Sequence, residues 1–528
     1  EFDYCSVHSA QALRAAGAHS IMLNSNPETV STDFDTSDRL YFDPLDEESV
    51  RDILENEGLS SLSAEFPVQE GLDGRDRPVA GPPVIVQFGG QTAINLAEGL
   101  HEAGFGVLGS SLDAIDLAED RERFESFLQS LGMRRPEGAS VRDVPEAIAA
   151  GRRIGYPLLV RPSYVLGGRA MRIVHDEEEL LGYIGTAAEV GGRHPVLLDR
   201  YIDGREVEVD AVCDGERVLI PGIVEHIERA GVHSGDSFGI YPPVDLTPEE
   251  IAQVEDMTQR IGLGLGLKGL MNVQYVVQEG LVYVLEVNPR ASRTVPFLSK
   301  ITGVPMVTLA TRVMLGETLE EMGYEGGLLP PRDLFAVKAP VFSMSKLIGV
   351  DAVLGPEMKS TGEVMGIDAE VGPALMKAML ASGINPPEGG MVLLSIAERD
   401  KEQVVSLARD LVDLGYSLAC TEGTSTFLEE QGVRVSQVVH KIGSVRPNIV
   451  DVIRRRQVCA VINTISPSKK PVRDGFEIRR AAVEAGVPCL TSLDTARSLV
   501  RALLGRGEYT VATVAEYREG RTALAGRA

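Results

Sequence analysis

The sequence lacks several features that would assign it to a familiar class. None of its apolar runs reaches the roughly 18 residues needed to cross a bilayer, and no basic-then-apolar signal opens the chain, so a membrane protein is not expected. Its five cysteines are scattered and include no CxxC pair, which argues against a disulfide framework and indicates a reducing, cytoplasmic compartment. Tryptophan is absent too, which decides nothing.

Positive charge is also scarce. The chain carries 51 basic and 77 acidic residues, a net charge of −26, so its surface should repel phosphate backbones and nucleic acid is not an expected partner. No GxxxxGK[ST] segment occurs, which excludes a P-loop. If the protein uses a nucleotide, another scaffold holds it.

The length of 528 residues is too great for one hydrophobic core and predicts roughly three or four domains. The chain opens at Glu1 without an initiator methionine, so we expect a fragment. Its first hundred residues alternate helix-like and strand-like segments, which predicts a parallel α/β sheet. The expected elements are a helix over Ser9–Ala16, a strand over Ser20–Leu23, a strand over Pro83–Gln87, a helix over Thr92–Ala103 and a strand over Gly106–Leu108.

A Gly-, Ser- and Pro-rich stretch from Asn56 to Pro82 interrupts this pattern, and we interpret it as a surface insertion rather than a domain linker, because the same alternation resumes afterwards. A second region follows from about Ser111 to Ser382. Within it, Asp143 is expected to cap a helix that ends before Gly155. A break at Pro386–Gly390 then precedes a small α/β domain that reaches Ala528.

The segment Leu285–Arg293 has the strongest chemical pattern. Glu286 and Asn288 are two residues apart on a predicted strand, so their oxygens leave the same face, where they suit Mg²⁺. Gln274, on a predicted neighbouring strand joined by a turn at Glu279-Gly280, adds a third oxygen. Arg290 and Arg293 follow as this strand ends, and they would place cations where charge develops on a transferring phosphoryl group. The alternative is a polar strand edge with surface ion pairs.

Three further segments are weaker when taken alone. Arg161–Met171 contains Gly167-Gly168 between arginines, which suits either a phosphate-covering loop or a plain turn. Glu225–Ser237 holds two histidines and three acids, but its spacing fits no zinc site and it is equally a solvated loop. Glu206 and Glu208 share one strand face, which a half-exposed strand explains equally well.

One motif is a decoy. Gly264–Gly269 matches GxGxxG, but a dinucleotide fingerprint needs a strand before it and a helix after it. Here a helical stretch precedes the glycines and a strand follows. A dinucleotide site is therefore not expected.

In their order along the chain, these motifs resemble the second synthetase half of the large subunits of carbamoyl-phosphate synthetases, an ATP-grasp family. The segments that carry the resemblance are Asn24–Asp33, Gln87–Thr92, Glu119–Phe124, Arg161–Met171, Gly231–Asp236, Leu285–Arg290 and Leu354–Gly366. The resemblance covers essentially the whole chain and implies a pre-ATP-grasp Rossmann-like domain over 1–110, an ATP-grasp domain over 111–385 and a methylglyoxal-synthase-like α/β domain over 386–528.

The resemblance also implies an activity, the ATP-dependent phosphorylation of carbamate to carbamoyl phosphate for pyrimidine and arginine biosynthesis. Mg²⁺ or Mn²⁺ would be held by Gln274, Glu286 and Asn288. Arg290 and Arg293 would steady the phosphoryl group and carbamate. The residues implied around ATP are Arg121, Arg161, Arg200, Ile202, Glu206, Gly231, Val232, His233, Ser234, Gln274 and Glu286.

The C-terminal domain is implied to bind a nucleotide monophosphate as effector. The matching positions are Lys401, Thr421, Thr424, Lys441 and Asn463. Ile465 stands where the family has a threonine that contacts the nucleotide, and in this the sequence departs from the family's site for a uridine nucleotide. Ala339 stands where a glutamate helps to hold ornithine, although Glu228 and Asp236 match. Methylglyoxal synthase activity is not predicted, because the Asp-bearing stretch of those enzymes is not recognisable.

The expected partners are the N-terminal synthetase half, in the same or a separate chain, a glutaminase small subunit, and further copies in an oligomer. No cysteine lies in a recognisable Cys–His glutaminase setting, so glutamine hydrolysis is assigned to the small subunit. Two alternatives stay open. One is another ATP-grasp ligase, such as a biotin carboxylase relative; the other is a nucleotide-sensing module without phosphotransfer.

Overall fold

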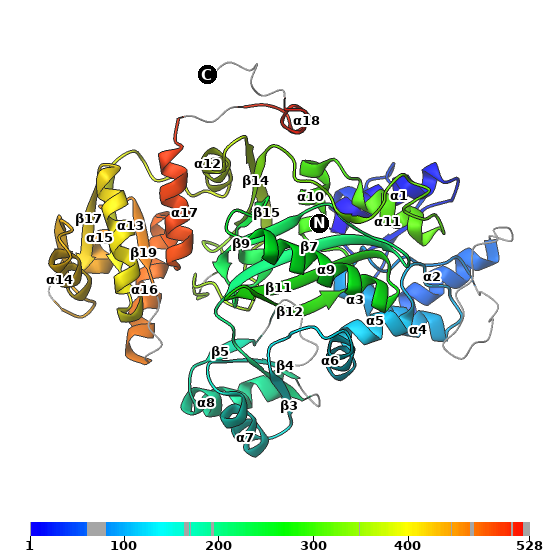
Figure 1. Cartoon of the computed structure of the whole chain (residues 1–528), viewed down its shortest axis with the longest axis horizontal. Helices are drawn as coiled ribbons and strands as arrows, with labels where there is room; N and C mark the ends of the chain where they lie inside the picture. The colour runs from blue at the N-terminus through cyan, green and yellow to red at the C-terminus, as the bar shows by residue number, and fades with distance from the viewer. Residues whose placement is uncertain are drawn as a thin grey trace. The chain divides into compact units, whose positions relative to one another are not determined.

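The computed structural model describes residues 2–60, 81–162, 168, 170–191, 195–347, 349–444, 446–464, 469–507 and 511–520. Figure 1 shows the helices and strands of these residues. They divide into two compact units, each built from several stretches of chain. The first unit comprises Glu1–Pro136, Val207–Glu225 and Pro242–Arg332. The second comprises Glu137–Glu206, His226–Tyr241 and Asp333–Ala528. None of the helices in the described ranges combines the length and apolar character that crossing a membrane requires.

The first unit opens with the predicted α/β alternation. Its elements are α1 (Phe2–Ala15), β1 (Ile21–Asn24), β2 (Arg39–Phe42), α2 (Glu47–Ser60), α3 (Gly90–Ile94) and α4 (Ala97–Glu102). β1 and β2 pair in parallel, as expected. Because α2 continues to Ser60, the expected insertion is helical at its start; residues 61–80 lie outside the described part of the chain.

Two predictions in this region are wrong in detail. The strands expected over Pro83–Gln87 and Gly106–Leu108 are reduced to one parallel bridge between Val84 and Val107, because only Val84 exchanges backbone hydrogen bonds with the second segment. The single helix expected over Thr92–Ala103 is divided into α3 and α4. The Leu96 amide bonds to a carbonyl three residues back, which interrupts the α-helical pattern.

The core of the first unit packs α5 (Leu112–Glu119), α6 (Arg121–Ser130) and α9 (Pro248–Leu265) against antiparallel strands. β11 (Lys268–Gln278) lies between β12 (Leu281–Asn288) and β7 (Arg205–Asp214). The buried face is mostly valine, leucine and isoleucine, as strands covered on both faces require. Since α9 ends before Gly266 and β11 follows, the GxGxxG segment sits between a helix and a strand, and the interpretation as a decoy is confirmed.

Smaller elements complete this unit. They are β8 (Val218–Ile220), α10 (Thr294–Thr302), α11 (Met306–Met314) and β13 (Gly327–Leu328). β8 pairs with both β7 and β13. α10 starts directly after the arginine-bearing end of β12, so the first unit carries the predicted metal and phosphoryl residues at the junction of a strand and a helix.

The second unit contains a four-stranded antiparallel sheet in the order β3-β6-β4-β5. Its elements are β3 (Gly138–Val141), α7 (Val144–Ile154), β4 (Leu158–Pro162), β5 (Arg172–Val174), α8 (Glu177–Gly191) and β6 (Val196–Arg200). The Asp143 side chain accepts the Glu146 amide and Pro145 lies in the first turn, so the predicted cap of α7 is confirmed. Apolar residues of both helices pack on this sheet.

Four further strands of this unit are hydrogen-bonded in the order β9-β10-β14-β15. These strands, with the helix that packs on them, are β9 (Ile223–Arg229), β10 (Gly239–Tyr241), β14 (Phe335–Val341), β15 (Gly362–Asp368) and α12 (Val371–Ala381). The loop between β9 and β10 contains a one-turn 3₁₀ helix over Ser234–Asp236. This loop includes four of the residues expected around ATP.

The C-terminal part of the second unit is a five-stranded parallel sheet in the order β18-β17-β16-β19-β20. Its strands are β16 (Gly390–Ser395), β17 (Tyr416–Thr421), β18 (Gln437–Val439), β19 (Ala460–Asn463) and β20 (Cys489–Leu490). Its helices are α13 (Lys401–Asp413), α14 (Glu422–Glu430), α15 (Ile449–Arg454), α16 (Lys469–Ala485), α17 (Leu493–Leu504) and α18 (Val514–Arg518). The fresh strand predicted after Gly390 is confirmed.

The strand order of this sheet reverses between β16 and β19. In open parallel sheets, ligands bind in the crevice outside the carboxyl ends of the strands at such a reversal. Ser395 ends β16 and Asn463 ends β19, so both stand at this crevice.

Candidate nucleotide and metal site

The β11–β12 hairpin carries the predicted oxygen ligands. Gln274 stands directly opposite Glu286 in the antiparallel register, and Asn288 stands opposite Asn272. The Asn288 amide donates to Glu286 Oε1 over 3.1 Å. Gln274, Glu286 and Asn288 are all half-buried, so each residue keeps part of its surface accessible. One carboxylate and two amide oxygens form a hard but incomplete ligand set, which suits a Mg²⁺ that also takes phosphate oxygens.

A buried polar network joins Asn272 of this hairpin to the neighbouring strand β7. The Asn272 side-chain nitrogen donates to Glu208 Oε1 at 2.9 Å and to Asp210 Oδ1 at 3.2 Å. Thr294 donates to the other Glu208 oxygen at 2.8 Å, and Ser292 donates to Asp210 Oδ2 at 2.7 Å. The side-chain nitrogen Nδ2 of Asn288 also donates to Asn272 Oδ1 at 3.4 Å, so this network helps to orient Asn288, a candidate metal ligand.

The sequence pattern did not reveal this network. The half-exposed strand that was one explanation of Glu206 and Glu208 is wrong, because both side chains are buried and nearly all of β7 is inaccessible. The signal for Asn272 was available, since it is two residues before Gln274 and therefore shares its strand face. No pattern pointed to Ser292 or Thr294.

The arginines after β12 lie beside the ligand set. Arg290 Nη2 donates to Asn288 Oδ1 at 3.2 Å, and Arg290 Nε donates to Gln91 Oε1 at 3.4 Å. Gln91 in turn donates to Glu119 over 2.8 Å; burial raises the pKa of the Glu119 carboxyl, although Gln91 and Arg290 act in the opposite direction. Arg293 immediately precedes α10 and is half-buried. Arg121 is the first residue of α6.

In the second unit, the other candidates sit at the ends of strands. Arg161 on β4 pairs with Asp199 at 3.1 Å, and the β4–β6 register brings Arg200 opposite Leu158. Arg200 Nη1 donates to the Ile154 carbonyl at 2.8 Å. Ile202 follows β6 and is half-buried. Of the loop predicted to cover phosphates, residues 163–167 and Arg169 lie outside the described residues, and Gly168 is described with a positive φ of 68°.

The Gly231–Ser234 segment is half-buried and is held by backbone and side-chain contacts. The Tyr201 hydroxyl donates to the Ala230 carbonyl at 2.6 Å, and burial raises the pKa of Tyr201 to about 12. The His233 amide donates to the Gly355 carbonyl at 2.8 Å, while His233 Nδ1 accepts the Gly235 amide at 3.0 Å. Buried Lys338 reaches the Ser234 carbonyl over 3.5 Å. The sequence analysis did not single out Lys338.

Glu225–Ser237 is not one solvated loop. Its first five residues belong to β9, where Glu225, His226 and Glu228 are buried. His226 Nδ1 lies 3.5 Å from Glu206 Oε1, so this histidine supports a candidate nucleotide ligand. Among the residues the structure describes, no cluster of three or more His, Cys, Asp or Glu side chains is arranged to hold a metal. The metal interpretation of this segment has no support there.

The C-terminal candidates lie at or beyond the carboxyl ends of strands of the parallel sheet: Thr421 ends β17, Asn463 ends β19, and Lys441 follows β18. Thr424 Oγ1 accepts the Ile396 amide at 3.2 Å and also contacts Thr421 at 3.1 Å. Asn463 Nδ2 donates to the Ser395 carbonyl at 3.2 Å. Lys401 pairs with Glu398 at 2.7 Å, and Lys441 is exposed. Ile465 lies outside the described residues, whereas Ala339 is a fully buried residue of β14.

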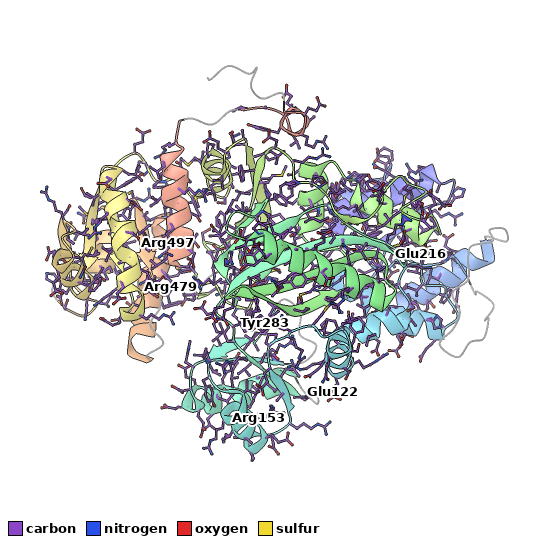
Figure 2. The ribbon with its side chains drawn as sticks, viewed as in Figure 1. Glu122, Arg153, Glu216, Tyr283, Arg479 and Arg497 are labelled. Carbon is purple, nitrogen blue, oxygen red and sulfur yellow. The ribbon has the colours of Figure 1, made fainter. Side chains whose placement is uncertain are left out.

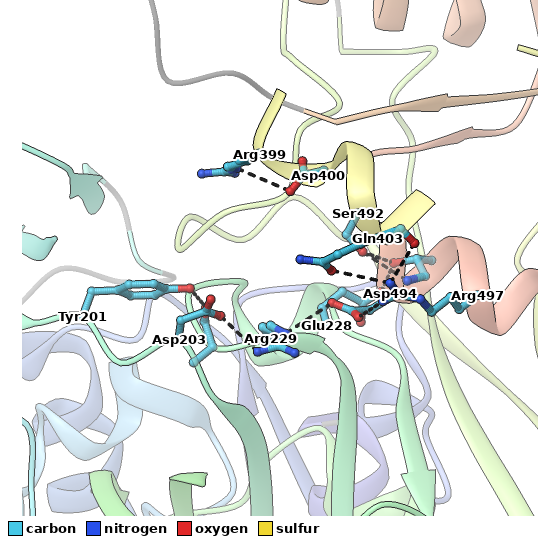
Figure 3. A network of polar contacts seen from close by, with 12 residues as sticks. Tyr201, Asp203, Glu228, Arg229, Arg399, Asp400, Gln403, Ser492, Asp494 and Arg497 are labelled. Atoms are coloured by element: carbon cyan, nitrogen blue, oxygen red, sulfur yellow. Dashed lines mark hydrogen bonds and ion pairs between the residues drawn. The ribbon is translucent and has the colours of Figure 1, made fainter. Parts of the chain in front are cut away.

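The start of α17 contacts the end of β9, as Figure 3 shows. The Thr495 hydroxyl donates to Glu228 Oε1 at 2.7 Å, and the Phe238 amide donates to Glu228 Oε2 at 2.8 Å. Burial nevertheless raises the pKa of Glu228 to about 6. Arg229 lies between Asp203, at 3.5 Å, and Asp494, at 3.7 Å. These contacts link α17 to the strand that leads into Gly231–Ser234.

Solved structures with a similar fold include biotin carboxylases. The biotin carboxylase domain of the Hydrogenobacter thermophilus 2-oxoglutarate carboxylase, solved with MgADP, ADP and bicarbonate, has a TM-score of 0.54 and 19% identity, over 71% of this chain and 87% of that one. A biotin carboxylase complex from Campylobacter jejuni has a TM-score of 0.53 and 16% identity, over 72% and 88%. At this identity the likeness shows the fold, which is that of the ATP-grasp ligases.

Sequence relatives narrow the class. Three family models match: "Carbamoyl phosphate synthase preATP-grasp domain" over 1–117, "Carbamoyl-phosphate synthase L chain, ATP binding domain" over 120–322, and "MGS-like domain" over 403–491. A carbamoyl phosphate synthase large chain from Thermomicrobium roseum is 56% identical over 526 residues, 99% of this chain and 47% of its own length. The chain belongs to the carbamoyl phosphate synthase large-chain family and spans about half the length of the curated relatives it matches.

Proposed function

We propose that this chain phosphorylates carbamate with ATP, acting as the second synthetase half of a carbamoyl phosphate synthase large chain. The observation that carries the proposal is the β11–β12 hairpin, where Gln274 and Glu286 stand opposite each other and Arg290 bonds to Asn288. The 56% identity to a carbamoyl phosphate synthase large chain over nearly the whole chain supports it. The proposed domains are 1–110, 111–385 and 386–528.

The reaction joins a carbamate oxygen to the γ-phosphorus of ATP and breaks the bond from that phosphorus to the β–γ bridging oxygen. ADP leaves with that electron pair, and carbamoyl phosphate forms. In-line phosphoryl transfer of this kind depends on positioning and charge stabilisation more than on proton transfer. The protein's own task is therefore to hold the γ-phosphate and the carbamate in line and to exclude water.

Each group of residues has a proposed role in that task. Gln274, Glu286 and Asn288 hold Mg²⁺ or Mn²⁺, which when bound neutralises charge on the phosphate oxygens. Arg290 and Arg293 stabilise the charge that builds on the phosphoryl group and orient carbamate. The proposed ATP contacts are Arg121, Arg161, Arg200, Ile202, Glu206, Gly231, Val232, His233, Ser234, Gln274 and Glu286.

We propose that the crevice between β16 and β19 binds a nucleotide monophosphate effector. Lys401, Thr421, Thr424, Lys441 and Asn463 are its proposed contacts, and the reversal of strand order at this place supports a ligand site. Ornithine is not proposed as an effector, because Ala339 offers no carboxylate and is fully buried. The proposed partners are an N-terminal synthetase half, a glutaminase small subunit and further copies of the chain, in the cytoplasm, in pyrimidine and arginine biosynthesis.

The reverse half-reaction tests the proposal. Purified chain supplied with MgADP and carbamoyl phosphate is expected to form ATP. A biotin carboxylase-like enzyme would instead be recognised by ATP hydrolysis that depends on biotin and bicarbonate. A nucleotide-sensing module would bind ADP and transfer nothing.

A further inference from the structure

Arg479 is a buried cation that the proposed mechanism does not use. It lies on α16 (Figure 2), and its side chain is about 3% exposed. All the contacts that define its orientation are charged or polar: Nε and Nη2 donate to the two Asp351 oxygens at 2.7 and 2.6 Å, and Nη1 donates to Asn463 Oδ1 at 2.7 Å. A guanidinium is planar, so one side chain holds an aspartate by two bonds while its third edge holds an asparagine.

The two partners of Arg479 belong to different parts of the second unit. Asn463 ends β19 at the crevice of the C-terminal sheet. Asp351 begins the segment 351–360, which lies between β14 and β15 in sequence. Burial acts to raise the pKa of Asp351, but hydrogen bonding and charge from Arg479 prevail and lower it, so the pair is ionised when formed.

The segment 351–360 in turn holds the Gly231–Asp236 loop. The Gly355 carbonyl accepts the His233 amide at 2.8 Å. The Lys359 amide donates to Asp236 Oδ2 at 2.8 Å, and the Ser360 amide donates to Asp236 Oδ1 at 2.8 Å. Asp236 is fully buried, so these two amides are fixed partners of its charge.

The same segment also lies against Gly168, a described residue of the other predicted nucleotide loop. A Cβ on Gly168 would lie 1.9 Å from the Pro356 carbonyl oxygen, which no side chain tolerates. Gly168 also has a positive φ of 68°, so glycine is required there on two counts. A shift of the 351–360 segment would therefore change its contacts with the Gly231–Asp236 loop and with Gly168 at once.

We propose that Arg479 is a positioning residue that couples the crevice at Asn463 to the Gly231–Asp236 loop and to Gly168, through Asp351 and the segment 351–360. This inference rests on the proposed function for the meaning of the loops as nucleotide ligands. The coupling itself is a property of contacts within the second unit. The Arg479 guanidinium bonds to Asn463 and to Asp351. A ligand that draws Asn463 away removes one of these partners, and the change reaches the segment 351–360 and the Gly231–Asp236 loop through Asp351.

Hydrogen–deuterium exchange of the full chain tests the coupling without any activity. In Arg479→Lys and Asp351→Asn, the amides of His233, Lys359 and Ser360 are expected to exchange at least about tenfold faster, because the segment that pairs them loses its anchor. Asn463→Ala should change the same amides less, because Arg479 keeps both bonds to Asp351. Arg454→Gln is the matched control, since Arg454 forms an exposed pair with Glu484 on the same domain.

The enzymatic readout is ATP formation from MgADP and carbamoyl phosphate. Arg479→Lys is expected to raise the KM for ADP by about fivefold or more, in the range of typical couplings between sites, while kcat changes less. The double variant Arg479→Lys/Asp351→Asn should be no worse than the poorer single variant, because both remove one interaction.

The outcomes separate the two proposals. Unchanged exchange at His233, Lys359 and Ser360 in folded Arg479→Lys and Asp351→Asn would overturn the coupling, even if ATP forms. Unchanged exchange in Asn463→Ala would overturn the link to the crevice. If the wild-type chain forms no ATP while the variants show the predicted changes in exchange, the proposed function is overturned and the coupling stands.

Discussion

Gln274 and Glu286 face each other across the β11–β12 pair because the register shifts by one residue between Gln274 and Tyr275. Near the turn, Gln278 pairs with Leu281 and Tyr275 with Val284. A regular ladder would continue this series and place Gln274 opposite Leu285. The bulge moves it opposite Glu286 instead, so the amide and the carboxylate leave the same face. The proposed metal site depends on this irregularity.

Glu286→Gln and Asn288→Asp are expected to change the Mg²⁺ dependence of phosphoryl transfer and to lower its rate while the fold is kept. Glu286→Gln removes the one charge of the ligand set, so half-maximal rate should require more Mg²⁺. The measurement is a Mg²⁺ titration of ATP formation from ADP and carbamoyl phosphate. Glu279→Gln, in the exposed turn of the same hairpin, is the control. An identical rate for Glu286→Gln at every Mg²⁺ concentration would remove Glu286 from the site.

Arg293→Ala is expected to lower kcat by about a hundredfold or more and to change the KM for ATP or ADP little. Removing one donor that acts on developing charge costs on the order of 3 kcal/mol, and this cost falls on the transition state. Steady-state kinetics in both substrates separate the two constants. Lys300→Ala, an exposed cation on α10, controls for loss of charge alone. A change confined to KM would make Arg293 a ground-state binding group.

Asn272→Ala is expected to destabilise the first unit by about 3 kcal/mol, because it leaves carboxylate oxygens of Glu208 and Asp210 buried without their shared donor. The measurement is a urea titration in which hydrogen exchange of the first-unit amides reports unfolding. The midpoint urea concentration should fall while the dependence of the free energy on urea concentration is unchanged. Gln253→Ala removes an exposed amide that bonds to the Gly280 carbonyl, and should cost far less. Equal midpoints for the two variants would show that the network contributes nothing.

Glu228 is expected to make stability fall as pH rises. Burial raises its pKa in the folded state to about 6 from an ordinary value of 4.5, so its favourable contribution is complete below that lower value and is lost as pH rises through about 6. The loss is about 2 kcal/mol. Residue 228 of Glu228→Gln stays neutral. The unfolding midpoint of this variant should therefore rise relative to that of the wild type as pH increases from about 5 to about 7.5. Glu402→Gln, an exposed position on α13, should show no such gain, and a constant difference between Glu228→Gln and wild type would contradict the account.

The sequence was sufficient for elements with strong local signals. The cap at Asp143, the turn at Glu279-Gly280 and the break before β16 all follow from residue types with a fixed local preference. The oxygen set on β12 follows from strand periodicity. The opposition of Gln274 and Glu286 does not, because a bulge leaves no reliable mark in a sequence.

Contacts between distant segments were out of reach for another reason. Arg479 and Asp351 are 128 positions apart, and neither lies in a motif. The burial of Glu206 and Glu208 was likewise not predictable. Alternating valines and glutamates are typical of a strand with one solvent-exposed face, and only the partners of the two carboxylates show that this face is buried. Those partners, His226 and Asn272, come from other strands.

ATP formation from MgADP and carbamoyl phosphate is the most direct test of the central claim, that the hairpin of this chain carries phosphoryl transfer between carbamate and ATP. The wild-type chain and Glu279→Gln are predicted to form ATP at similar rates that depend on Mg²⁺ and on carbamoyl phosphate. Glu286→Gln should form it far more slowly, although still folded. If the folded wild-type chain binds ADP and yet forms no ATP from carbamoyl phosphate, the claim is contradicted.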